Sequence, residues 1–310
     1  MHAIKAALKR LARRRLAPVV FACIAWGLGG SAPVAAADGE PAAALRARYA
    51  TMAGKHAASP FQRPLYLDST ETSNAVRGDV FALLDYPFAE VNSVFNGPAR
   101  WCDVLILHIN TKFCAPTTNA AGSVLTLNIG KKTEEPLAQT SRVEFDYRVV
   151  TATADYLAVE LRADQGPLST TNYRILFEAA TGDGGKTIVH FGYSYAFGTA
   201  GRLAMQVYLA TAGRGKVGFT VTGTQPAGQP DYIGGVRGVV ERNTMRYFLA
   251  IDAYLAGTAA PPAERLEKRL QKWYDSTEVY ARQLHDVDRN AYLEMKRREY
   301  RRQQATAQPG

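Results

Sequence analysis

The stretch VEFDYRVV at residues 143–150 places Val143, Phe145, Tyr147 and Val149 at alternate positions, with charged residues between them. Alternation with a period of two is typical of a β-strand that has one buried and one solvated face. The stretch therefore predicts a strand whose apolar side chains point into a core.

Three following segments, 156–162, 173–179 and 187–195, repeat the alternation and are separated by short turns. The turn GDGG at residues 182–185 is typical of a β-hairpin. Together these segments predict an antiparallel meander with one apolar, aromatic face and one face that meets water. His190 falls on the polar face, which predicts a surface histidine.

Residues 239–255 carry the strongest helical pattern, a wide apolar stripe that ends before Gly257. We expect this helix to cover the apolar face of the sheet, because such a face needs a partner layer. Glu241, Arg242 and Arg246 are predicted to lie on a solvated helix face; the alternative is that they reach the head group of a ligand.

The remaining segments predict shorter elements. Residues 101–113 fit a buried helix and a buried strand equally well. Strands are expected at 75–84, with a bulge at Gly78, and at 124–129. Helices are expected at 87–95, at 202–211 and over much of 263–304, and residues 38–62 are expected to form either a helix or a linker. A hairpin is expected at 216–235.

The first 37 residues resemble an export signal, with six basic residues, an apolar run and Ala35, Ala36 and Ala37 before Asp38. The alternative is a membrane span, but the run is shorter than the roughly 20 residues that a bilayer requires. We therefore predict a periplasmic or secreted protein.

In that compartment Cys102 and Cys114 are expected to form a disulfide. Their spacing matches no metal site, and no metal or cofactor is expected.

Charge argues against nucleic acid as a partner. Removal of residues 1–37 lowers the formal net charge from +9 to +3, and all of this excess lies in residues 264–310. The basic cluster there is predicted to be a solvated helix end; the alternative is contact with an anionic membrane surface. Its members are Lys296, Arg297, Arg298, Arg301 and Arg302.

The segment RGDVFALLDYPFAEV at residues 77–91, followed by Trp101, resembles the opening of START-related lipid-transfer and polyketide-cyclase-like domains. This resemblance implies an α+β helix-grip fold, in which a curved antiparallel sheet wraps around a long C-terminal helix. The predicted division is a signal peptide at 1–37, an N-terminal helix or linker at 38–74, the helix-grip domain at 75–257 and a charged helical extension at 258–310.

The resemblance also implies a cavity between sheet and helix that holds a hydrophobic or amphipathic small molecule, for instance a lipid. Aromatic rings with several hydroxyls suit such a site, although the same residues could simply fill a core. The candidate ligand-binding residues are Phe145, Tyr147, Tyr173, Phe177, Phe191, Tyr193 and Tyr247.

Catalytic motifs are scarce, and no catalytic residue is predicted. The sequence contains no GxSxG, HExxH or P-loop pattern, and His108 is expected to be a satisfied core histidine. We therefore expect a binding protein. The alternatives are a cyclase- or hydrolase-like enzyme that uses His108 or a tyrosine, and a module that docks another envelope protein.

Overall fold

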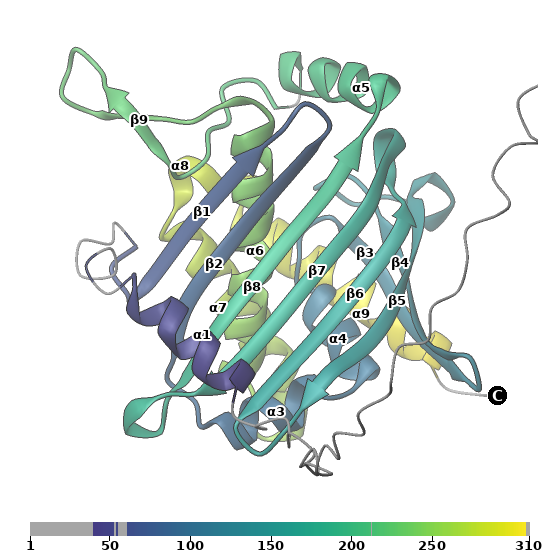
Figure 1. Cartoon of the computed structure of the whole chain (residues 1–310). Helices are drawn as coiled ribbons and strands as arrows, with labels where there is room; N and C mark the ends of the chain where they lie inside the picture. Colours follow the sequence, from purple (N-terminus) through teal and green to yellow (C-terminus); the bar gives the residue numbers. More distant parts are fainter. Residues whose placement is uncertain (1–39, 53, 55–60, 212, 308–310) are drawn as a thin grey trace, which may run out of the picture. The chain divides into compact units, whose positions relative to one another are not determined.

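The alternating segments form one antiparallel sheet of eight strands, in the order β1-β2-β8-β7-β6-β5-β4-β3 (Figure 1). The computed structural model describes residues 40–52, 54, 61–211 and 213–307, so the predicted signal peptide lies outside the described residues. The strands are β1 (Leu65–Glu71), β2 (Ala75–Leu84), β3 (Thr111–Asn119), β4 (Gly122–Ile129), β5 (Ser141–Ala152), β6 (Tyr156–Gln165), β7 (Thr170–Thr181) and β8 (Thr187–Phe197).

Helix α6 (Gly235–Ala256) packs against the apolar face of this sheet, where it contacts β1, β2 and β8 (Figure 1). Nearly the whole helix is buried, because α7 contacts it in addition to the sheet. The predicted helix-grip arrangement of the α+β class is therefore confirmed. Strand β1, which sequence reasoning missed, lies inside the segment expected to be a helix or linker.

Gly78 is not at a bulge, and that prediction was wrong. The pairing of β2 with both β1 and β8 runs through Gly78 without a shift of register. A Cβ atom at this position would collide with the Thr244 hydroxyl of α6. The glycine is therefore needed for the close approach of helix and strand.

The ambiguous residues 101–113 divide into a helix and a strand. Helix α3 (Phe88–Phe95) is followed by α4 (Pro98–Leu105), which begins at a proline, and the chain then enters β3. The Trp101 indole donates to the Phe95 carbonyl at 3.0 Å. The predicted disulfide is present, and it joins Cys102 of α4 to Cys114 of β3.

The opposite face of the sheet does not simply meet water, as had been predicted. Helix α1 (Glu40–Ala50) lies across it and contacts β7 and β8 (Figure 1). Ala42 and Leu45 are buried there in a second, smaller apolar cluster that includes Phe81 and Tyr156. His190 lies beneath this layer and is fully buried, so the expectation of a surface histidine was also wrong.

The C-terminal charged segment forms α7 (Arg265–Glu278), α8 (Ala281–Leu284) and α9 (Arg289–Ala307). Helix α9 packs against β3, and the Lys296 amine is buried, where it donates to the carbonyls of His108 and Thr111 at 2.7 Å. Lys296 is therefore no part of a solvated helix end. Arg297 and Arg298 pair with Glu267 and Glu134. Membrane contact through this segment stays a prediction.

The remaining elements are short. Helix α5 follows β8, and a small hairpin precedes α6, as expected from 202–211 and 216–235. These elements and the four turns of 3-10 helix are α5 (Thr199–Ala210), β9 (Val221–Thr224), β10 (Pro230–Tyr232), η1 (Leu137–Gln139), η2 (Pro167–Ser169), η3 (Asp183–Gly185) and η4 (Pro262–Glu264).

Candidate ligand-binding site

Five of the seven predicted site residues lie together between the sheet and α6. Ring centroids are 6.2 Å apart for Phe145 and Tyr173, 6.1 Å for Tyr173 and Tyr193, and 5.4 Å for Tyr193 and Tyr247. Phe191 contacts Tyr247 at 6.1 Å. Tyr195 stacks on Tyr173 at 5.2 Å and completes a group of six rings. We call Phe145, Tyr173, Phe191, Tyr193, Tyr195 and Tyr247 the aromatic cluster.

The other two predicted residues point elsewhere. Phe177 packs against Phe95 at 4.8 Å and Trp101 at 5.8 Å, under helices α3 and α4. The Tyr147 hydroxyl donates to the Phe95 carbonyl at 3.1 Å. Both residues therefore hold α3 and α4 against the sheet, and neither belongs to the aromatic cluster.

The tyrosines of the aromatic cluster border accessible space. Tyr173, Tyr193 and Tyr247 are 9%, 6% and 7% exposed, whereas Phe177 on the same sheet face is fully enclosed. Burial raises the pKa of each of these tyrosines, so their hydroxyls stay protonated and can donate hydrogen bonds. The cluster thus combines apolar ring faces with polar hydroxyls, and its tyrosines keep small exposed fractions.

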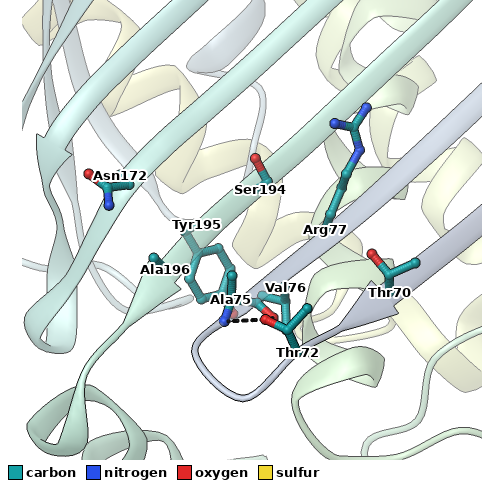
Figure 2. A pocket seen from close by; sticks show the side chains of 9 residues that line it. All are labelled: Thr70, Thr72, Ala75, Val76, Arg77, Asn172, Ser194, Tyr195 and Ala196. Carbon is teal, nitrogen blue, oxygen red and sulfur yellow. Dashed lines mark hydrogen bonds between the residues drawn. The ribbon is translucent and has the colours of Figure 1, made fainter.

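Two pockets lie away from the seven predicted aromatic rings, although Tyr195 of the aromatic cluster lines the first of them. One, of about 320 Å³, opens on the outer face of the sheet, beside the turn between β1 and β2 (Figure 2). Thr70, Arg77, Asn172 and Ser194 are among its lining residues. The second, of about 350 Å³, includes Arg63, Asp85 and Asp252, and none of the seven predicted residues lines either pocket.

Arg242 and Arg246 of α6 are buried, so the prediction of a solvated helix face was wrong. The Arg246 guanidinium donates to Asp286 at 2.6 Å, and Arg242 donates to the Val217 carbonyl at 3.1 Å and hydrogen-bonds to Tyr208. Glu241 is also buried. Its carboxylate accepts from the Ser69 and Thr220 hydroxyls and from backbone N–H groups of the loop before β9.

Two lysines from loops converge on the same aspartate. Lys132 donates to Asp286 at 2.5 Å, and the Lys216 amine lies 3.3 Å from it. Burial alone would raise the pKa of Asp286, but Arg246 and Lys132 lower it to about 2. Burial and the neighbouring Arg246 lower the pKa of Lys132 to about 8. We call Lys132, Lys216, Arg242 and Arg246 the cationic cluster.

His108 connects the two clusters. Its ring stacks on Tyr247 with centroids 4.4 Å apart. Burial, and then the charges of Arg246, Lys296 and Lys132, hold its pKa well below 6.5, so the ring is neutral. Its Nδ1 accepts from the Asn110 N–H at 3.2 Å, whereas Nε2 has no partner among the described residues. The prediction of a fully satisfied core histidine was therefore wrong.

Sequence reasoning missed the assembly of the cationic cluster. Arg242 and Arg246 are four residues apart on one helix, which places them on the same face. From the sequence, this spacing could have predicted that the two arginines lie side by side. Lys132, Lys216 and Asp286 lie in loops with no periodic pattern. Only the folded chain brings them to α6.

The described residues give no indication of a metal centre or of a membrane-crossing helix. No three His, Cys, Asp or Glu side chains within these residues gather as metal ligands. Within the same ranges, no helix is both long enough and apolar enough to cross a bilayer.

Comparison with known proteins identifies similar solved structures only. No family model and no curated protein matches the sequence. One of the similar structures is norcoclaurine synthase from Thalictrum flavum in complex with dopamine and hydroxybenzaldehyde, which is 11% identical in sequence. The match covers 48% of this chain and 79% of the synthase chain, with a TM-score of 0.31.

Two further structures are similarly distant. Ara h 8.0201 is 10% identical over 62% of this chain and 97% of its own, with a TM-score of 0.33. Human StAR-related lipid transfer protein 5 is 10% identical over 49% of this chain and 83% of its own, with a TM-score of 0.30. At such identities and scores, no ligand or activity follows for this chain. Its α+β helix-grip architecture is established by its own sheet and α6.

Proposed function

We propose that this protein binds a hydrophobic or amphipathic small molecule, such as a lipid, between the sheet and helix α6. The observation that carries the proposal is the aromatic cluster, whose tyrosines face one another and yet border accessible space. Aromatic walls with a few polar groups are typical of small-molecule sites. The rings contact one another, so a bound molecule must move some of them apart.

We further propose that the protein acts outside the cytoplasm, in the periplasm or as a secreted protein. The export-signal pattern of residues 1–37 supports this location. The disulfide between Cys102 and Cys114 supports it too, because disulfides persist in oxidising compartments. Fractionation of cells that express the full chain, followed by N-terminal sequencing, tests it. The expected result is a mature N-terminus near Asp38.

Titration with the neutral fluorescent probe N-phenyl-1-naphthylamine tests binding. We expect a saturable fluorescence increase. The Tyr193→Ala variant, which loses a ring from the aromatic cluster, should bind about tenfold more weakly, equivalent to about 1.4 kcal/mol. The matched control is Tyr232→Ala in β10, which lies outside the aromatic cluster and should leave the affinity unchanged.

Two results would contradict the proposal. One is the absence of saturable binding by the folded protein. The other is an equal loss of affinity in the Tyr193→Ala and Tyr232→Ala variants, because it would place the probe outside the aromatic cluster. Mass spectrometry of organic extracts from the purified protein then identifies any molecule that purifies with it.

A further inference from the structure

Basic groups outnumber acidic ones where the cationic cluster surrounds Asp286. Three basic side chains, those of Lys132, Lys216 and Arg246, pair with the Asp286 carboxylate. Arg242 interacts with Asp286 through its charge alone, and Arg242 and Arg246 are at most 2% exposed. Two further acidic groups are already engaged elsewhere: Glu299 pairs with Lys112 and Lys296, and the buried Glu241 carboxylate accepts hydrogen bonds from Ser69, Thr220 and backbone N–H groups. Buried charge without a counter-charge is costly, so this region favours an additional negative group.

Two buried N–H groups in the region of the cationic cluster and His108 also have no acceptor among the described residues. They are Nε of Arg246 and Nε2 of His108. Because Nδ1 of the neutral His108 ring accepts from Asn110, its proton resides on Nε2, which is therefore a donor. A buried donor without an acceptor loses the hydrogen bond that it makes in water. Both atoms would be satisfied by an acceptor, and the surrounding charge favours an anionic one.

We propose that the cationic cluster, with His108, binds the anionic group of the ligand, a carboxylate or a phosphate. This inference rests on the proposed function, since it places the apolar part of the ligand among the rings of the aromatic cluster. Tyr247 joins the two regions, because its ring stacks on His108 and contacts Tyr193. Asp286, in the loop between α8 and α9, competes with the ligand for the same cations.

Four probes separate the contribution of the anionic group from that of the chain. Dodecyl phosphate, dodecanoate and neutral dodecanol have the same chain length, and inorganic phosphate has no chain. Isothermal titration calorimetry at pH 7 should show both anionic amphiphiles binding at least about tenfold more tightly than dodecanol. Inorganic phosphate should bind weakly at the same site.

Variants at the cluster test its role directly. Lys132→Gln should reduce the affinity for both anionic amphiphiles about tenfold and leave that for dodecanol unchanged. Lys131→Gln is the matched control, because Lys131 is the neighbouring residue, is 74% exposed and pairs with Glu135 instead. Asp286→Asn should increase the affinity for the anionic amphiphiles, since it removes the competing carboxylate. Circular dichroism verifies that each variant is folded.

The outcomes distinguish this inference from the function on which it rests. Equal binding of dodecanol and the anionic amphiphiles, or equal losses in Lys132→Gln and Lys131→Gln, would overturn the anion site and leave the proposed function standing. Binding of inorganic phosphate that Lys132→Gln abolishes, with no amphiphile bound, would support the anion site and overturn the proposed function. Failure of all four probes to bind would overturn both.

Discussion

Gly78 shows how a single missing side chain positions the long helix. It lies in β2 at the point where Thr244 of α6 reaches the sheet, and a Cβ atom there would meet the threonine hydroxyl. The Thr244 hydroxyl itself donates to the Val240 carbonyl within the helix at 2.8 Å. The contact is therefore between a rigid strand and a side chain that is held in place.

Replacement of Gly78 by alanine should lower the free energy of unfolding by about 1–3 kcal/mol, because it overpacks this contact. Urea unfolding monitored by circular dichroism measures the loss. In the double variant with Thr244→Ala, part of the loss should be recovered, since the colliding hydroxyl is gone. Gly223→Ala is the control, because a Cβ atom at Gly223 meets nothing within 4 Å. Equal effects of Gly78→Ala and Gly223→Ala would contradict this account.

Helix α9 is a structural element of the body, although its composition is that of a charged tail. Tyr292 is fully buried and its hydroxyl donates to the Leu107 carbonyl at 2.8 Å. The Lys296 amine donates hydrogen bonds to two carbonyls and also pairs with Glu299 at 2.8 Å. Burial, only partly offset by Glu299, lowers the pKa of Lys296 to about 8. The helix thus closes the end of the core beside β3.

The Lys296→Met variant should lose at least about 3 kcal/mol of unfolding free energy, because it leaves buried acceptors and Glu299 with fewer partners. Arg301→Met, five residues further along the same helix and exposed, should change it by less than about 0.5 kcal/mol. Thermal and urea unfolding provide the comparison. Similar stability of the two variants would show that the buried contacts of Lys296 contribute little to the fold.

At the scale of the whole molecule, two buried histidines make opposite contributions to the pH dependence of stability. His190 lies 2.5 Å from Glu178 and 2.6 Å from Asp79. Burial opposes its charged form, but hydrogen bonds with both carboxylates prevail and raise the pKa of His190 above 6.5. The pKa of His108 lies well below 6.5 because the ring is buried among cations.

The signs follow from proton binding in the folded and unfolded chains. The stability contributed by His190 is fully present below pH 6.5 and is lost as the pH rises through its raised folded pKa. His108 destabilises the fold as the pH falls below 6.5, because only the unfolded chain then takes up its proton. The summed contribution of these two residues to stability should therefore be greatest near pH 6.5.

Urea unfolding between pH 5 and 9 tests this expectation. His190→Gln should remove the decline on the alkaline side, and His108→Gln should reduce the decline on the acid side. An alkaline decline of the same size in His190→Gln would show that the Asp79–His190–Glu178 group does not cause it.

The elements and the class of the fold follow from local patterns in the sequence. The alternation in 143–195 and the stripe in 239–255 are each repeated over many residues, and so they predicted the meander, α6 and the covering of the apolar sheet face by this helix. The helix-grip arrangement was predicted from the resemblance carried by residues 77–91 and Trp101. Five of the seven predicted ligand-binding residues also meet. Four of them lie on strands, where alternate residues share one face, and Tyr247 meets them from α6. Their role in binding stays a prediction.

Only the tertiary structure decided which polar residues are buried and what they meet. His190, Arg242, Arg246 and Lys296 all occupy positions whose local pattern indicates solvent, yet each is enclosed by an element distant in sequence. The physical reason is that periodicity records one face of one element, whereas burial of the other face depends on which further element packs there. For this chain, α1 packs on β7 and on β8, the strand that carries His190, and the loops that carry Lys132 and Asp286 meet α6 to create the cationic cluster.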